Sequence, residues 1–354
     1  MTSNGHGNGA ASEKFSVVSL FSGCGGMDYG FRGGFRVFGK EYVALPFHIK
    51  WANDLSEAAC KTYRKNLDDV IVCGDIWKLL DTLPKRADVV IGGFPCQDVS
   101  INGKLAGVHG ETRSGLYRAM VKVIEQCKPS VFVAENVKGL LQRYNKENLA
   151  KVLADLSELG YNLSYNLYLA ADYGVPQMRQ RVFIVGTAQG VKPFRPPWPL
   201  LRKSEWMTSK QAIGDLESMA ESAAINHVWS RAERSPEQGN RVLKADQPSD
   251  TIRAECHGNI QYHYSLPRRL SMREAARIQS FPDTFIFDAK LRETERQVGN
   301  AVPPVLAWHI ARAVSECLSS CHDERAPYIA AQGMLPGFQE RGRYIVIPAP
   351  RSNA

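Results

Sequence analysis

Short apolar runs recur along the chain, and most of them end at glycine or at a polar residue. Runs of this length that are rich in β-branched side chains predict buried strands. They cover residues 15–21, 47–52, 70–73, 87–91, 130–134, 161–170 and 182–186, and 344–347 form a last candidate strand. The chain thus predicts a sheet with most of its strands in the first half.

Segments with apolar residues at helical spacing lie between and after these strands. They cover residues 27–31, 55–65, 116–126, 147–159, 269–279 and 305–318, with a loop expected over 296–304. Strands that alternate with helices are typical of an α/β protein with helices on both faces of its sheet. We therefore predict a Rossmann-like, doubly wound mixed sheet.

The first predicted strand runs into a glycine-rich segment, Ser22-Gly23-Cys24-Gly25-Gly26, and a short helix follows. This order is typical of the start of a nucleotide-cofactor site, because glycine lets the backbone approach a ligand closely. The segment lacks the last spaced glycine of the dinucleotide fingerprint. A tight turn with no ligand is the alternative interpretation.

Acidic residues follow the second and third predicted strands. Asp54 lies where a carboxylate can accept hydrogen bonds from ribose hydroxyls, although it could equally cap the next helix. Asp75 stands between Gly74 and Ile76 after the third strand. Since parallel strands end at one edge of a sheet, these residues predict a single ligand crevice.

The fourth predicted strand runs into Gly92-Gly93-Phe94-Pro95-Cys96. Two glycines and a proline interrupt regular strand structure, so we expect the strand to stop there and its backbone to approach a ligand. A thiol at this edge can act as a nucleophile where its surroundings favour the thiolate. The alternative is a buried structural cysteine, as most free cysteines are.

Further candidate groups follow the fifth strand and precede the seventh. Glu135 begins Glu135-Asn136-Val137 and would face the same crevice, with a helix cap as the alternative. Arg179 and Arg181 share one face by the two-residue period of a strand. Two arginines can bind an anion or a base, or can be solvated or paired within the protein.

Three segments differ in composition from the predicted sheet and helices. Residues 101–114 contain several glycines and predict a mobile loop over the crevice. Prolines at 193, 196, 197 and 199 indicate a linker. The polar residues 200–267 follow, and 246–264 predict short strands whose polar and aromatic tips suit nucleic-acid grooves. A small solvated domain is the alternative.

The 354 residues are 44% hydrophobic and 23% charged, typical of an ordinary globular protein. The net charge of +8 favours a polyanionic partner without proving one. A polar leader (1–14), the absence of a bilayer-length apolar run and eight scattered cysteines predict a cytoplasmic protein with reduced thiols and no membrane contact. Cys317, Cys321 and His322 form only one weak cluster of ligand types, so we expect no metal.

These motifs, taken in order, resemble the cytosine-carbon-5 DNA methyltransferases of bacterial and phage type. The resemblance extends from residue 16 to 314. It rests on Phe21-Ser22-Gly23, Gly74-Asp75-Ile76, Pro95-Cys96-Gln97, Glu135-Asn136-Val137, Gln177-x-Arg179-x-Arg181, the 270–281 helix and Gln297-Val298-Gly299-Asn300. One departure is Asp54, where many members have Glu; Asp can still accept from ribose hydroxyls.

The resemblance implies S-adenosylmethionine as the cofactor, double-stranded DNA as the substrate and a monomer, and it allows for a cognate restriction endonuclease. The implied cofactor-binding residues are Phe21, Gly23, Gly25, Gly26, Asp54, Leu55, Asp75, Ile76, Pro95, Leu116, Asn300 and Val302. The implied organisation is a catalytic domain (15–190 plus 296–320), a smaller, mostly β target-recognition domain (191–295) and a C-terminal extension (321–354).

The chemistry implied for the site is covalent. Addition of a thiolate from Cys96 to ring carbon 6 of cytosine makes carbon 5 able to accept a methyl group. Glu135, if buried and protonated, would donate to ring nitrogen 3, while Arg181, and less directly Arg179, would hold the 2-carbonyl oxygen. The target base must leave the stacked duplex, and loop 101–114 would cover it. No side chain stands out as the base that removes the carbon-5 proton.

Two other functions share parts of this pattern. The same fold could methylate RNA, or the protein could be a DNA-binding regulator without activity. The long and varied 200–267 stretch favours DNA, and the complete set of Cys96, Glu135 and Arg181 favours an enzyme. Candidates for contacts with bases or phosphates, each of which could equally be solvated, are Arg231, Arg241, Arg253, Gln261 and His263.

Overall fold

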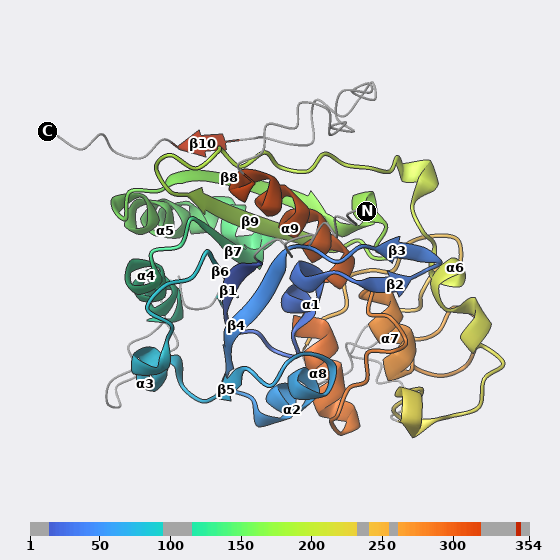
Figure 1. The fold of residues 1–354 in the computed structure, drawn as a ribbon. Coiled ribbons are helices and arrows are strands. Elements are labelled where there is room, and N and C mark those ends of the chain that lie inside the picture. Colours follow the sequence, from blue (N-terminus) through green and yellow to red (C-terminus); the bar gives the residue numbers. More distant parts are fainter. Residues whose placement is uncertain (1–13, 95–114, 232–240, 255–260, 320–344, 348–354) are drawn as a thin grey trace, which may run out of the picture.

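The structure is a computed structural model that describes residues 14–94, 115–231, 241–254, 261–319 and 345–347 (Figure 1). Its centre is an eight-stranded sheet in the order β10-β8-β9-β7-β6-β1-β4-β5. These strands are β1 (Phe15–Leu20), β4 (Phe47–Asp54), β5 (Ile71–Cys73), β6 (Val89–Gly93), β7 (Val131–Val137), β8 (Asn162–Leu169), β9 (Gln180–Thr187) and β10 (Ile345–Ile347). A separate hairpin consists of β2 (Phe35–Val37) and β3 (Lys40–Tyr42).

The sheet is mixed, as the sequence predicts. Strands β5, β4, β1, β6 and β7 pair in parallel, whereas β9 is antiparallel to both β7 and β8, and β10 is antiparallel to β8. The parallel strands share their carboxyl ends at one edge, where open α/β sheets place ligands. The antiparallel β9 begins at that same edge, so the start of β9 lies beside the end of β7.

Helices cover both faces of the sheet (Figure 1). One face carries α1 (Gly26–Arg32), α2 (Glu57–Asn66) and α9 (Pro304–Leu318), and the other carries α3 (Ile76–Leu79), α4 (Leu116–Cys127) and α5 (Lys146–Glu158). Alternate residues of each central strand enter different cores: Val17 and Val89 pack with α1 and α9, while Val18 and Val90 pack with α4. This period of two is what a sheet covered on both faces requires.

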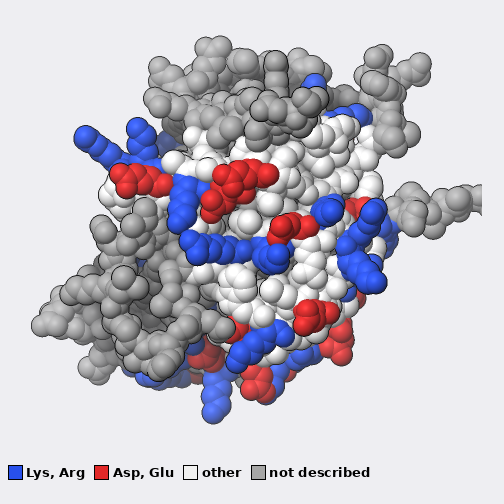
Figure 2. Space-filling view, turned by 90° about the vertical axis from the view of Figure 1, so that its left-hand side faces the viewer, with Lys and Arg blue, Asp and Glu red and all other residues white. Residues whose placement is uncertain are grey.

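The remaining helices connect the sheet or lie beyond it. They are α6 (Ser209–Ile213), α7 (Met272–Ile278), α8 (Leu291–Asn300) and the 3₁₀ turns η1 (Leu80–Thr82), η4 (Lys138–Leu141), η5 (Arg143–Asn145), η6 (Ala170–Tyr173), η7 (Lys203–Glu205), η8 (Gly214–Leu216) and η9 (Ala223–Ile225). Figure 2 shows acidic and basic side chains interspersed on the side where α3, α4 and α5 lie. That charge pattern is typical of a solvated face.

The structure corrects several predicted boundaries. Strand β6 continues through Gly92 and Gly93 instead of stopping before them, and β7 extends through Glu135 to Val137. Both extensions follow from the pairing of Gly93 with Glu135, which keeps the two strands in register to their ends. The loop expected over 296–304 is wrong for residues 296–300, because α8 runs to Asn300 and buries Thr294, Gln297 and Val298 on one side.

The short strands expected over 246–264 are not formed at the described residues. In their place are single bridges that pair Gln177 with Ser249, and Tyr262 with both Val242 and Arg269. Each bridge joins a single pair of residues and is not continued by the neighbouring pair, so no strand ladder forms. Besides the two apolar cores on the faces of the sheet, a third apolar cluster connects residues 241–281 to the start of the chain and to α8. In it Ile252 and Phe281 pack with Cys24 and Val298.

Across the part of the chain that the structure describes, every helix is too short or too polar to cross a bilayer.

One buried carboxyl in α1 gives a pH-dependent prediction. Asp28 is fully buried and accepts a hydrogen bond from the Tyr63 hydroxyl (2.9 Å). Burial raises the pKa of Asp28 from 3.8 to about 6, against the opposing effect of hydrogen bonds from Ser19 and Tyr63. The folded state therefore binds the proton of Asp28 more tightly than the unfolded state does. The stability that this proton contributes is lost as the pH rises from about 4 through 6.

Asp28→Asn removes this titration. In urea unfolding, the free energy of unfolding of the variant should rise relative to that of the wild type by about 2 kcal/mol between pH 4.5 and 7, and the two should run parallel above pH 7. A difference that stays constant from pH 4.5 to 8 would contradict the assignment.

Candidate active site

A nearly buried ion pair lies at the carboxyl end of β7. The Nε atom of Arg181 is 2.8 Å from Oε1 of Glu135, and each side chain is only 11% exposed. Arg181 also donates from Nη1 to the carbonyl of Gln180 (2.8 Å). Burial lowers the pKa of Arg181, and the carboxylate beside it opposes that shift. The pair thus fixes the orientation of an acid and a guanidinium at the edge where the parallel strands end.

Gly93 lies directly opposite Glu135 in the β6–β7 pairing. A Cβ atom at residue 93 would come 2.8 Å from Oε2 of Glu135, closer than real side chains approach. Glycine at this position therefore lets the carboxylate lie over the neighbouring strand. Gly93 is therefore needed to make room for the side chain of Glu135, and it does not end the strand as the sequence suggested.

Asn136 fixes the chain that leaves β6. Its Nδ2 donates to the carbonyl of Phe94 (3.0 Å), and its Oδ1 accepts from the backbone N–H of Val137 (2.8 Å). Pro95 and Cys96, which come next, lie outside the described residues, as does the 101–114 segment. Sequence reasoning gave Asn136 no role of its own, although its place between Glu135 and Val137 in the motif was the available signal.

Asp54 joins the glycine-rich segment to the end of β4. Its two oxygens accept the backbone N–H groups of Gly23 and Ser56, each at 2.8 Å. The helix cap of α2 is Ser56, whose hydroxyl accepts from Ala59, so the alternative of Asp54 as that cap is wrong. Burial raises the pKa of Asp54, and these backbone hydrogen bonds oppose the shift. A carboxylate oxygen can accept more than one hydrogen bond, so ribose hydroxyls remain compatible with this geometry.

The far end of the chain closes over the glycine-rich segment. Gly23 and Gly25 have positive φ values of 58° and 90°, and Phe21 has one of 53°. A Cβ atom on Gly26 would come 2.5 Å from the carbonyl oxygen of Val302, so the two backbones are in contact. Val302, which is buried, therefore lies against the start of α1, and the exposed Asn300 lies two residues before it in the chain.

The other predicted cofactor residues lie around the ends of β4 and β5. Asp75 caps α3 by accepting the N–H of Trp77 (3.1 Å), and Ile76 is buried in the core beside α4. Leu116 at the start of α4 is half-buried against that core. Leu55 is 73% exposed, which leaves a large apolar side chain next to Asp54. A carboxylate next to an apolar surface suits a ligand with both a ribose and a flat ring.

Comparison with known proteins identifies the family. The model of the C-5 cytosine-specific DNA methylases matches residues 15–245 and 209–316. The chain belongs to the C-5 cytosine-specific DNA methylases. It is therefore a DNA cytosine-5-methyltransferase, and the ordered motifs of its sequence are those of the family.

Individual relatives agree over most of their length. The chain is 37% identical to the type II methyltransferase M.NgoFVII of Neisseria gonorrhoeae over 349 residues, covering 89% of this chain and 90% of that protein. It is 34% identical to the type II methyltransferase M.FnuDI of Fusobacterium nucleatum, covering 86% and 95%. Among solved structures, the Dnmt2 methyltransferase of S. pombe has a TM-score of 0.64 at 18% identity and covers 86% of this chain and 99% of that one. This last likeness shows the shared methyltransferase fold.

The two arginines that the sequence paired have separate partners in this methyltransferase. Arg179 is fully buried, and its guanidinium donates to the backbone carbonyls of Ile252, Gly299 and Ala301, each at 3.0 Å. Burial lowers the pKa of Arg179 well below its usual value. Only Arg181 pairs with Glu135 in the part of the chain that the structure describes.

Two of the five candidates for DNA contacts are wrong. Gln261 and His263 are buried and hold local loops: Gln261 bonds Ser249 and Asp250, and the His263 ring accepts from the N–H groups of residues 265 and 266. The other three are exposed: Arg231, Arg241 and Arg253. Arg231 forms an ion pair with Glu221 and lies 5.1 Å from the ring centroid of Trp229.

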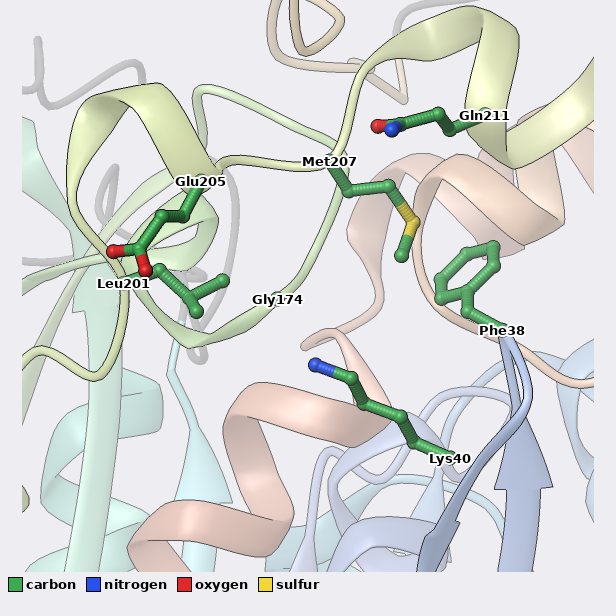
Figure 3. Close-up of a pocket in the computed structure, with 7 residues that line it drawn as sticks. All are labelled: Phe38, Lys40, Gly174, Leu201, Glu205, Met207 and Gln211. Carbon is green, nitrogen blue, oxygen red and sulfur yellow. The ribbon is translucent and has the colours of Figure 1, made fainter.

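An open cleft of about 370 Å³ lies between the β2–β3 hairpin and the chain at 201–211 (Figure 3). It is lined by Phe38, Lys40, Gly174, Leu201, Glu205, Met207 and Gln211. The side-chain oxygens of Glu205 and Gln211 accept backbone N–H groups of Arg202 and Thr208. The cleft contains none of the predicted site residues, so we do not assign catalysis to it.

The described residues contain no group of three or more His, Cys, Asp or Glu side chains that could hold a metal ion. Cys321 and His322, which the sequence placed in a weak cluster, lie outside them.

Gly93→Ala tests the packing around Glu135. The added methyl group must displace the carboxylate from its place beside Arg181, so we expect methyl transfer to fall by about 10–100-fold while the fold is kept. Gly139→Ala is the matched control, because the nearest atom to its added carbon is 3.6 Å away. Steady-state rates of both variants check this; equal rates in the two would contradict the role given to Gly93.

Proposed function

We propose that this enzyme methylates carbon 5 of cytosine through a covalent adduct of Cys96, with S-adenosylmethionine as the methyl donor. The observation that carries the proposal is the Glu135–Arg181 pair, which lies against Gly93. From Gly93 the chain leads through Phe94, held by Asn136, toward Cys96. This arrangement supports a nucleophile, an acid and an anion-binding guanidinium acting on one base.

The chemistry assigns a separate task to each group. The thiolate of Cys96 adds to ring carbon 6, and the negative charge moves toward ring nitrogen 3. Glu135 would bind nitrogen 3 through a shared proton and so neutralise that charge, and Arg181 would hold the 2-carbonyl oxygen while keeping Glu135 in place. Carbon 5 then takes the methyl group, with S-adenosylhomocysteine as the leaving group, and gives up its proton to a water or hydroxide. The carbon–sulfur bond breaks, nitrogen 3 returns its proton to Glu135, and the aromatic ring and the Cys96 thiolate are restored.

The cofactor would lie in the crevice between the glycine-rich segment and the end of β4. When bound, S-adenosylmethionine supplies an electrophilic methyl group. Asp54 would accept the ribose hydroxyls, and the exposed Leu55 would cover one side of the adenine. The remaining contacts would come from residues around the same edge: Phe21, Gly23, Gly25, Gly26, Asp75, Ile76, Pro95, Leu116, Asn300 and Val302.

The substrate would be duplex DNA with its target cytosine turned out of the helix. The relatives named above are type II methyltransferases, which supports a modification enzyme that protects a specific sequence from a cognate restriction endonuclease. Residues 191–295 would form the recognition domain beside a catalytic domain of 15–190 and 296–320. A monomer that acts on host DNA in the cytoplasm fits this role.

Methyl transfer from labelled S-adenosylmethionine to mixed-sequence duplex DNA and to total RNA tests the proposal. We expect label in DNA only, with bisulfite sequencing of a host that expresses the protein giving a single recurring target. Label in RNA alone would contradict the choice of substrate, and no label in either would contradict the enzyme.

The recognition domain has a test of its own. When residues 200–267 are replaced by the corresponding stretch of another family member, we expect the methylated sequence to change to that of the donor protein while methyl transfer persists. Bisulfite sequencing reads the outcome, and an unchanged target sequence would show that the recognition domain lies elsewhere.

A further inference from the structure

Three polar side chains with almost no exposure form a hub between three distant parts of the chain. They are Gln177, Arg179 and Gln279, each at most 1% exposed. Gln177 donates to the side-chain oxygen of Gln279 (2.6 Å), which links the approach to β9 with the end of α7. Buried polar groups cost free energy unless they are hydrogen-bonded, so the partners of this hub define what it holds in place.

On one side the hub holds the segment 249–252 of the proposed recognition domain. The Ile252 N–H donates to Oε1 of Gln177 (2.9 Å), and the Ile252 carbonyl accepts from Nη1 of Arg179 (3.0 Å). Ser249 exchanges backbone hydrogen bonds with Pro176 and Met178 at 2.9 and 2.7 Å. Both backbone groups of Ile252 are thus bound to side chains that belong to the catalytic part.

On the other side the hub holds the end of α8 and the turn after it. Nη2 of Arg179 donates to the carbonyls of Gly299 and Ala301, and Nε2 of Gln279 donates to those of Val298 (2.7 Å) and Ala301 (3.0 Å). This stretch includes Asn300 and leads directly to Val302, which lies against Gly26. The hub therefore binds the backbone that closes the proposed cofactor crevice.

The two held segments also touch each other. A Cβ atom on Gly299 would come 2.4 Å from the backbone of Arg253 and Ala254, so only glycine allows this approach. A shift of the 298–302 turn must therefore move either the hub or the 249–254 segment. Close-packed elements of this kind change together rather than independently.

We propose that Arg179, with Gln177 and Gln279, is a positioning residue that couples the cofactor crevice to the recognition segment 249–254. Cofactor binding at Asn300 and Val302 restricts the motion of the 298–302 turn. Because the Arg179 guanidinium is bonded to both that turn and Ile252, the motion of Ile252 is restricted as well. The inference rests on the proposed function, because it takes the cofactor to lie beside residues 300 and 302. It gives Arg179 a role distinct from that of Arg181, which faces the acid.

The chain offers a matched control for this role. Arg273 is also fully buried, and its guanidinium donates to three backbone carbonyls, those of Ile225, Pro282 and Phe285, at 2.8–3.0 Å. These bonds lie within residues 225–285 and do not reach the 298–302 turn. Arg179→Lys and Arg273→Lys thus remove similar hydrogen bonds from similar surroundings, and only the first cuts the proposed link.

Hydrogen–deuterium exchange of the full chain, with and without S-adenosylhomocysteine, measures the coupling. In the wild type we expect the ligand to slow exchange in peptides that cover 249–254 by about tenfold. In Arg179→Lys the ligand should still bind, but the slowing at 249–254 should fall below about threefold, while Arg273→Lys keeps the wild-type response. Gln279→Met, which removes the bonds to Val298 and Ala301, should behave as Arg179→Lys and replaces it if that variant does not fold.

The outcomes separate the two proposals. If S-adenosylhomocysteine binds the wild type without slowing exchange at 249–254, the coupling is refuted and the cofactor site stands. Equal slowing in the hub variants and in Arg273→Lys would also refute it, since the hub would then be structural only. If calorimetry shows that the ligand does not bind the wild type, the proposed cofactor site itself is wrong, and the coupling falls with it.

Discussion

Replacing Glu135 by glutamine should lower the rate of methyl transfer by about 10²–10⁴-fold, the usual contribution of a positioned general acid. Glutamine keeps the size of the side chain and can still accept from Arg181, but it cannot give a proton to ring nitrogen 3. Because Glu135 lies on β7, away from Asp54 at the end of β4, S-adenosylhomocysteine should bind the variant with unchanged affinity. Single-turnover rates and calorimetry measure the two quantities separately.

Asp88→Asn is the control for this substitution. Asp88 precedes β6 at the opposite edge of the same sheet, where Oδ2 accepts from the backbone N–H and the hydroxyl of Ser16, both at 2.7 Å. The same change from carboxylate to amide there should affect stability and leave the methyl-transfer step unchanged. A Glu135→Gln enzyme that works at the wild-type rate would remove this acid from the mechanism.

Replacing Cys96 by serine should have the largest effect, a loss of methyl transfer of about 10⁴-fold or more, as for the nucleophile of other covalent enzymes. A hydroxyl is a far weaker nucleophile than a thiolate at neutral pH. Two of the other thiols, those of Cys127 and Cys24, are poor nucleophiles, because burial raises the pKa of Cys127 to about 11 and that of Cys24 to about 12. Transfer rates with labelled S-adenosylmethionine measure the loss.

Cys127→Ser is the matched control, since Cys127 is a buried thiol at the end of α4 that contacts the carbonyl of Pro84. We expect its transfer rate to match that of the wild type. If Cys96→Ser instead retains wild-type activity, a different group attacks the base.

The sequence predicted the fold well because the signal was local. Apolar runs ending in glycine or acid located the parallel strands, and the two-residue alternation of Val17 and Val18 is the direct result of helices on both faces. The ends of strands were predicted less accurately where pairing between distant residues determines them. From the sequence alone, the strand is expected to end before Gly93. In the structure Gly93 pairs with Glu135, so the strand includes it.

The sequence predicts which residues belong to the candidate site, but it does not predict which atoms they bond to. Motifs identify Glu135, Arg181 and Asp54, whereas the tasks of Arg179 and Asn136 depend on carbonyls that lie elsewhere in the chain. Arg179 meets Gly299 across 120 positions, a separation that no periodicity encodes. Gln261 and His263 were wrong as DNA contacts for the same reason, since tertiary packing buries them.

The covalent adduct can be observed directly with duplex DNA in which 5-fluorocytosine replaces cytosine. Fluorine at carbon 5 cannot leave as a proton does, so the adduct formed after methyl transfer cannot break down. With S-adenosylmethionine present, we predict a stable protein–DNA complex in which mass spectrometry finds the modified base on the peptide that contains Cys96. An enzyme that methylates ordinary duplex DNA but forms no such complex, or forms it at another residue, would contradict the mechanism.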